Sequence, residues 1–155
     1  LYSLAYSIKM LYKNMMKEEK DTEIKDFTVY PLEGIWKKLE EEKLDKSKLK
    51  YTIMIKQPNF ITQKNFSDAL EVVKKKKPSI LYDEIYFNSI EEGKSIQVLH
   101  IGSYDDEPIS FGKMEKLING LNLVRASDYH REIYLNNKNR TSIDKLKTIL
   151  RYSVK

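Results

Sequence analysis

Several stretches of the chain repeat apolar residues every three or four positions, which is the spacing of a helix with one buried face. The first such stretch covers residues 1–18. The second begins at Thr62, a residue type that caps helix N-termini, and runs over 62–76. A third covers 107–119, and a short final helix is predicted over 142–151.

Other stretches have the alternating or β-branched and aromatic character of strands. Residues 80–90 and 94–101 are predicted to form a hairpin that turns at Glu92-Gly93. The remaining strands are predicted at 27–32, 51–56, 121–124 and 131–136.

The order of these elements suggests a duplication. Helix, strand, strand occurs over 1–56 and again over 107–136, where the hairpin precedes it. The pattern predicts an α+β protein of two lobes, each an antiparallel sheet with a helix packed on one side, and a ligand cleft between the lobes.

The expected organisation is one domain over 1–155 that is incomplete at its N-terminus. The first lobe, 1–58, would lack its first hairpin. A connecting helix would cover 59–79, and the second lobe 80–155.

The composition of the chain argues against several classes of partner and binding site. The net charge is +5, from 28 basic and 23 acidic residues, but the basic residues are spread along the chain, so no nucleic-acid partner is predicted. There is no cysteine and there are two histidines, so we predict no metal site and no cofactor. No apolar run is long enough to cross a bilayer, so no membrane partner is predicted and a cytoplasmic location is expected.

Six segments, in order along the whole chain, resemble the GyrI-like small-molecule-binding family. They are 1–6, 31–36, 54–58, 97–108, 132–135 and 145–151. The resemblance implies a tandem pair of β-α-β-β modules, as in the ligand-sensing domains of transcription regulators such as BmrR and Rob. This chain is interpreted as a stand-alone member.

Strand alternation places Glu132 and Tyr134 on one face, which we expect to line the cleft. Ile133 and Leu135 would then contact the helix of the lobe. A carboxylate among aromatic rings is costly to desolvate unless a cation pairs with it. Spacing alone favours the interpretation that Glu132 is paired with a neighbour such as Arg125 or Arg131 and has no further role.

The resemblance favours a functional role for Glu132, because the matching Glu contacts the ligand in the family's sensors. It implies ligand-binding roles for Trp36, Tyr104, Glu132 and Tyr134. Each ring could instead be an ordinary packing residue, and His100 is more typical of a hydrogen-bonded core residue than of a catalyst. Asp105, Asp106 and Glu107 are interpreted as acids at a helix N-terminus rather than a metal cluster.

Three functions remain open. The first is binding of hydrophobic, including cationic, small molecules or xenobiotics in an aromatic cage. The second, implied by a branch of the family, is hydrolysis that opens electrophilic cyclopropane rings of DNA-alkylating natural products. Its candidate catalytic residues are Glu132 as general base for water, with Tyr134 or His100 polarising the leaving carbonyl. The third is an interaction that inhibits DNA gyrase.

Overall fold

A computed structural model describes residues 1–18, 25–37 and 51–155. The chain divides into two compact units. Unit 1 comprises Leu1–Tyr30 and Ile55–Ile90, and unit 2 comprises Pro31–Met54 and Glu91–Lys155.

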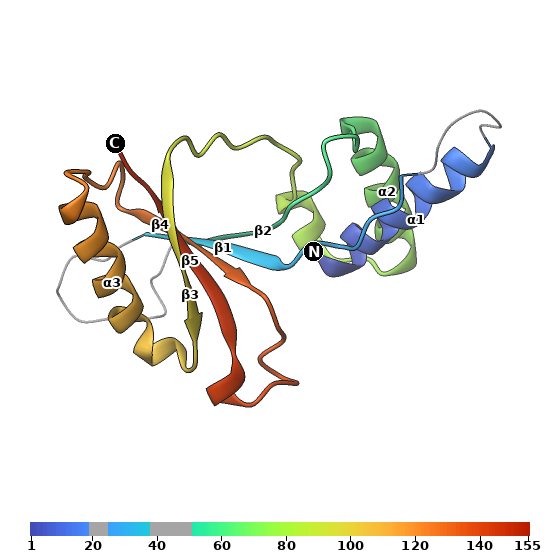
Figure 1. Cartoon of the computed structure of the whole chain (residues 1–155). Helices are drawn as coiled ribbons and strands as arrows, with labels where there is room; N and C mark the ends of the chain where they lie inside the picture. Colours follow the sequence, from blue (N-terminus) through green and yellow to red (C-terminus); the bar gives the residue numbers. More distant parts are fainter. Residues whose placement is uncertain (19–24, 38–50) are drawn as a thin grey trace. The chain divides into compact units, whose positions relative to one another are not determined.

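Unit 1 is helical. Helix α1 (Tyr2–Glu18) packs beside α2 (Gln63–Lys76), and the short 3-10 helix η2 (Ile80–Glu84) follows (Figure 1). Both predicted helices are confirmed. Thr62 caps α2 as predicted, because its hydroxyl accepts from the Asn65 backbone N–H at 3.3 Å while the Asn65 side chain accepts from the Thr62 N–H at 2.9 Å. The core between the helices contains Leu4, Ile8, Tyr12, Met16, Ile61, Phe66, Ala69 and Val73.

Unit 2 contains a five-stranded sheet of order β2-β1-β4-β5-β3, with α3 beside it (Figure 1). The pairings of β1 with β4, β4 with β5 and β5 with β3 are antiparallel. The elements are β1 (Leu32–Lys37), β2 (Tyr51–Ile55), β3 (Ser95–Ile101), η3 (Tyr104–Asp106), α3 (Glu107–Gly120), β4 (Tyr129–Tyr134), η4 (Ile143–Lys145) and β5 (Lys147–Ser153).

The α+β class is confirmed, and β3-α3-β4-β5 has the β-α-β-β order of one expected module. The order α1-β1-β2 repeats its last three elements. One feature differs from the prediction: the strands of the described residues join in a single sheet, where the repeat predicted a sheet in each lobe.

The predicted helix over 142–151 is wrong. Residues 143–145 form η4, and β5 follows as a strand in the middle of the sheet. Leu146, Ile149 and Leu150 satisfy helical spacing, but Thr148, Leu150 and Tyr152 are buried at every second position, as in a strand with one buried face. The sequence fits both the helical and the strand period, and hydrogen-bonded pairing of this segment with β3 and with β4 favours the strand.

Two further predicted strands are also wrong. Residues 80–90 form η2 and irregular chain, because Tyr82, Ile85 and Phe87 pack against the core of unit 1 instead of pairing with β3. Residues 121–124 form the turn after α3, where Asn122 has a φ of 53° and Leu123 packs on the core of unit 2. The strand predicted over 27–32 begins only at Leu32.

Helix α3 covers one face of the sheet. Its Met114 and Ile118 form a core with Leu150, Tyr152 and Val154. Residues paired across antiparallel strands lie on the same face. Glu132 pairs with Leu150, and Tyr134 with Thr148, so both point to the side of the sheet that α3 covers, the helix face.

This orientation corrects a prediction. Glu132 and Tyr134 do share a face, but Ile133 and Leu135 do not contact the helix of the lobe: Ile133 pairs with Ile149 on the opposite face, and Leu135 is 43% exposed. Alternation determines which residues share a face, but it does not determine which face receives the helix.

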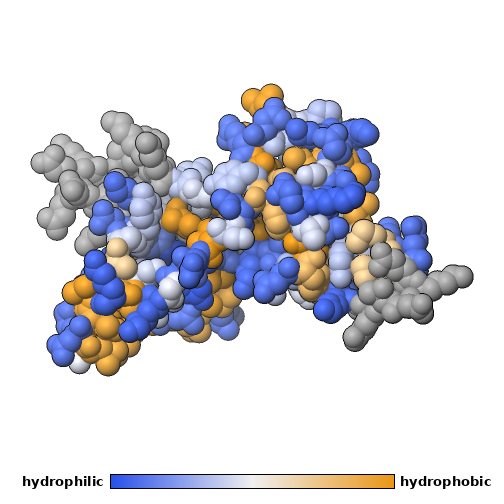
Figure 2. Space-filling model, turned by 90° about the horizontal axis from the view of Figure 1, so that it is seen from above, coloured by the Kyte–Doolittle hydropathy of each residue, from blue (hydrophilic) through white to orange (hydrophobic). Residues whose placement is uncertain are grey.

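The face drawn in Figure 2 shows hydrophobic side chains in patches between hydrophilic ones. Large exposed apolar residues include Ile80 in unit 1 and Ile109 in unit 2. Single apolar residues are ordinary on protein surfaces, so buried polar groups are the better guide to a site. No helix in the described part of the chain is long and apolar enough to span a membrane.

Candidate functional site

A row of polar and aromatic side chains lies on the helix face of the two central strands β1 and β4. His130, Glu132 and Tyr134 occupy alternate positions of β4. In β1, Gly34 pairs with Glu132 and Trp36 pairs with His130, so Trp36 joins the same row. The strand register therefore brings together residues almost one hundred positions apart in the chain.

Hydrogen bonds connect this row. The Trp36 indole Nε1–H donates to the Tyr134 hydroxyl at 3.1 Å, and that hydroxyl donates to Glu132 Oε2 at 2.7 Å. His130 Nε2 lies 2.9 Å from Glu132 Oε1, and the imidazole N–H is the donor because an ionised carboxylate can only accept. Glu132 is 8% exposed, so this is a buried carboxylate held by a phenol and an imidazole.

Gly34 makes room for this arrangement. A Cβ atom at this position would lie 2.6 Å from Trp36 Nε1 and 3.2 Å from the Tyr134 hydroxyl. The first distance is shorter than real Cβ contacts, so any side chain here would displace the indole. The glycine lets the indole lie over the strand within reach of Tyr134.

Further rings surround the row. Tyr51 of β2 stacks on Trp36 with ring centroids 5.1 Å apart. Tyr104 meets Tyr134 edge to face at 6.1 Å, and Phe111 of α3 meets His130 at 4.9 Å. Aromatic faces are suited to flat apolar molecules and to cations.

The predicted set Trp36, Tyr104, Glu132 and Tyr134 is thus brought together, whereas sequence reasoning missed Tyr51, Phe111 and His130. His130 could have been found, since it lies two residues before Glu132 on the same strand. Tyr51 could not, because its position depends on the pairing of β2 with β1.

A second carboxyl belongs to this cluster. Glu107 opens α3, and its atom Oε1 is buried with no hydrogen-bond partner in the part of the chain that the structure describes. Burial raises the pKa of Glu107 to about 8, helped by the charges of Glu132 and Asp105. Glu107 was interpreted only as an acid at a helix N-terminus, and the structure also places it within the electrostatic reach of Glu132.

The tyrosines of the cluster keep their protons. Burial raises the pKa of Tyr134, and the charge of Glu132 and the hydrogen bond to it act in the same direction. Burial also raises the pKa of Tyr104, with contributions from Glu107 and Glu132. Both hydroxyls are therefore hydrogen-bond donors rather than bases near neutral pH.

His100 has a structural environment. It is buried, its Nε2 lies 2.8 Å from the Ser103 carbonyl oxygen, and its Nδ1 lies 2.9 Å from the Ser110 hydroxyl. Since a carbonyl only accepts, Nε2–H is the donor, and Nδ1 accepts from Ser110 in the neutral ring. His100 thereby fastens the turn that carries Tyr104 to α3.

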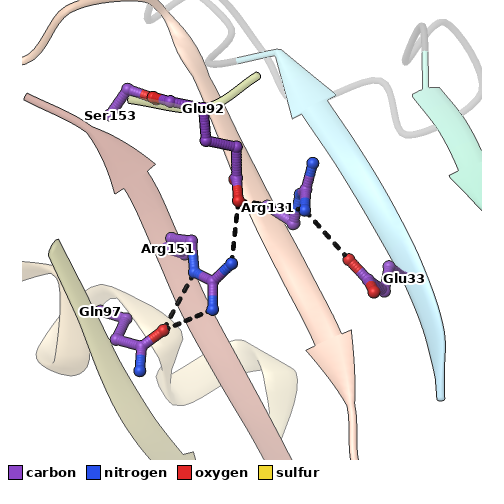
Figure 3. A network of polar contacts seen from close by, with 6 residues as sticks. All are labelled: Glu33, Glu92, Gln97, Arg131, Arg151 and Ser153. Carbon is purple, nitrogen blue, oxygen red and sulfur yellow. Dashed lines mark hydrogen bonds and ion pairs between the residues drawn. The ribbon is translucent and has the colours of Figure 1, made fainter. Parts of the chain in front are cut away.

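Neither arginine considered as a partner for Glu132 takes that role among the described residues. Arg131 Nη1 lies on the opposite face of the sheet, 3.3 Å from Glu33 and 3.2 Å from Glu92 (Figure 3). Arg125 lies over the Tyr152 ring at 4.3 Å. Neither Arg125 nor Arg131 therefore forms an ion pair with Glu132 in the part of the chain that the structure describes.

No group of three or more metal-ligating side chains suited to an ion occurs in residues 1–18, 25–37 and 51–155. The chemistry that these residues offer is hydrogen bonding, proton transfer and contact with aromatic faces.

Comparisons with known proteins agree with this picture. The GyrI-like small molecule binding domain matches residues 2–153. An uncharacterized conserved protein from Listeria innocua is 31% identical, with a TM-score of 0.84, and the match covers 100% of this chain and 76% of that one. Two structures described as hydrolases from Listeria innocua are 30% and 31% identical, with TM-scores of 0.81 and 0.83 and the same coverage.

The comparison with curated proteins finds no match. The family match nevertheless spans nearly the whole chain, and the neighbours match over its full length. The chain belongs to the GyrI-like small-molecule-binding domain family.

Proposed function

We propose that this protein binds hydrophobic small molecules, including lipophilic cations, against the aromatic rings around Glu132. The observation that supports the proposal is the burial of the Glu132 carboxylate and the identity of its hydrogen-bond partners. The carboxylate is buried and bonded to Tyr134 and His130, with no lysine or arginine partner among the described residues. A buried carboxylate without a permanent cation suits a ligand that brings its own positive charge.

The expected affinity is modest. Burying about 250 Å² of apolar ligand surface is worth roughly 6 kcal/mol before the cost of association. Each ring face that meets a cation adds roughly 0.5–2 kcal/mol. Such a site discriminates weakly between ligands of similar size, as a protein that sequesters xenobiotics requires.

Trp36 provides a direct test, because it is the only tryptophan in the chain and is bonded to Tyr134. Its emission should be titrated with N-methylacridinium, a flat cation, and with N-methylacridone, a neutral ring system of similar size. Both should bind. Glu132→Gln should weaken binding of the cation about tenfold, and binding of the neutral compound by less than about twofold, because only the cation interacts with the charge.

Asp106→Asn is the matched control, since it removes an exposed negative charge near the site. It should leave both affinities unchanged. If neither compound alters Trp36 emission or gives a binding signal by calorimetry, the proposed function is wrong.

Hydrolysis is the second candidate, and it is favoured by the two similar structures described as hydrolases. Glu132 would take a proton from water while the water oxygen bonds to a cyclopropane carbon, the strained C–C bond breaks, and its electron pair passes into the conjugated carbonyl, which then takes up a proton. Both ring nitrogens of His100 are bonded to Ser110 and Ser103, whereas Tyr134 lies beside Glu132, so Tyr134 is the better candidate to polarise the leaving carbonyl, by turning its O–H from Glu132 to the substrate. Cyclopropane rings of DNA-alkylating natural products remain the proposed substrate class.

Incubation with such a cyclopropane compound should give a product heavier by one water, detected by mass spectrometry. Glu132→Gln should slow its formation by a factor on the order of one hundred or more. Equal turnover by Glu132→Gln and the parent protein would exclude this mechanism while leaving the binding function intact.

A further inference from the structure

Glu107 is the least satisfied polar group of the site. It stands at the first position of α3, and its Oε1 is buried without a hydrogen-bond partner in the described residues. The neighbouring Asp106 is exposed and makes no capping hydrogen bond. Leaving a buried polar atom unpaired is unfavourable, so such an atom requires an explanation, and a ligand that completes its bonding is one.

The surroundings of Glu107 favour its neutral form. After burial, the strongest influences on its pKa are the negative charges of Glu132 and Asp105. Tyr104 and Tyr134 also interact with it, and His130 is bonded to Glu132 beside it. With a pKa of about 8, most Glu107 side chains carry a proton at neutral pH.

The two carboxyls therefore differ in what they offer. Glu132 accepts hydrogen bonds from Tyr134 and His130, and it presents negative charge. Glu107 Oε1 has no such donor among the described residues, so a protonated Glu107 can present an O–H group there. Two carboxyls whose environments separate their protonation states divide the acceptor and donor roles of a site.

We propose that Glu107 contacts the ligand and donates a hydrogen bond from its protonated carboxyl to an acceptor oxygen, such as the carbonyl of a flat aromatic ketone. This inference rests on the proposed function, and it adds aromatic carbonyl compounds to the ligands that the site selects. It also predicts that binding of these compounds is accompanied by the uptake of a proton.

The test is calorimetric titration of the whole chain with N-methylacridone, which has one acceptor oxygen and no ionisable group. At about pH 8, where Glu107 is half ionised, binding should take up roughly a quarter to just under half of a proton, because the protonated carboxyl donates and the ionised one binds the ligand more weakly. Titrations in two buffers of different ionisation enthalpy measure this uptake. Between about pH 7 and about pH 9.5, the affinity should fall roughly threefold to tenfold.

Glu107→Gln retains an N–H donor but cannot ionise, so it should bind N-methylacridone without proton uptake and with no fall in affinity at high pH. Asp106→Asn should retain both effects. If Glu107→Gln does not fold, the proton uptake and the pH dependence of the affinity of the parent protein decide the question.

The outcomes separate the two proposals. If N-methylacridone does not bind at all, the proposed function fails for neutral ligands. If it binds without proton uptake, or with proton release, or if Glu107→Gln retains the uptake, Glu107 is not the donor and only this further inference is overturned.

Discussion

Neighbouring residues of β4 carry charge on opposite faces of the sheet, and the two faces satisfy that charge in different ways. On the face away from α3, Arg131 bridges Glu33 and Glu92, and Arg151 reaches Glu92 and Gln97 (Figure 3). On the helix face, Glu132 is held by Tyr134 and His130, and no guanidinium among the described residues pairs with it.

The difference separates charges that are paired with one another on the sheet from the charge that we propose acts on a ligand. The arginine network pairs each guanidinium with a carboxylate, and it connects β1, β4, β5 and the segment before β3. On the helix face, Glu107 has an unpartnered oxygen within the described chain. Paired charges connect the strands of the sheet to one another. A buried polar atom without a partner, by contrast, can be satisfied by a bound ligand.

The largest expected effect comes from breaking the network at its centre. Arg131→Met removes the cation that the buried Glu33 and the half-buried Glu92 share, while Arg151 still pairs with Glu92, and it should lower the free energy of unfolding by about 3 kcal/mol. Urea unfolding followed by Trp36 emission measures this loss. Ligand affinity of the folded variant should not change, and a stable variant with altered affinity would contradict the assignment of Arg131 to structure.

A smaller effect is expected on the helix face from Tyr134→Phe. The variant leaves the Trp36 indole N–H and Glu132 Oε2 each without their partner, which should cost about 1–2 kcal/mol of unfolding free energy. Unlike Arg131→Met, it should also weaken ligand binding, because the indole and the carboxylate lose their fixed orientation. A stability change below about 0.5 kcal/mol would show that the hydrogen-bonded row does not persist in solution.

Sequence reasoning proposed four residues of the candidate site, Trp36, Tyr104, Glu132 and Tyr134, which the structure brings together, but it did not propose their other neighbours. Glu132 and Tyr134 follow from strand alternation and from the family resemblance, and Thr62 and α3 follow from helix signals. His130 was missed because its place in the row depends on the pairing of β4 with β1. Glu107 was missed because its environment depends on the burial of the first turn of α3.

The wrong secondary-structure predictions have a related cause. Residues 142–151 fit a helix period and a strand period equally, and only neighbouring strands distant in sequence decide between them. Residues 80–90 have strand-forming composition but pack on helices. Local pattern indicates which residues are buried, and long-range pairing decides which element buries them.

Gly34→Ala tests the space on which the site depends. The added methyl group would lie 2.6 Å from the Trp36 indole nitrogen, so the ring must move away from Tyr134. We expect ligand affinity to fall about fivefold, near 1 kcal/mol, with a shift in Trp36 emission. On the other face, Ile35→Val changes a neighbouring strand position and should leave affinity unchanged. Equal affinities for Gly34→Ala and the parent protein would show that the indole position is unimportant for binding.

The smallest effect is expected at the neutral end of the arginine network. Gln97 pairs with Arg151 across the strands, and its side-chain oxygen accepts from Nε at 2.9 Å and from Nη2 at 2.7 Å. Gln97 is exposed, so water can replace the amide, and Gln97→Ala should cost only about 0.5 kcal/mol of unfolding free energy. Glu92→Gln removes instead the carboxylate that both arginines share, and should cost more in the same urea titration. If Gln97→Ala were the more damaging of the two, hydrogen-bond geometry rather than charge pairing would hold this face together.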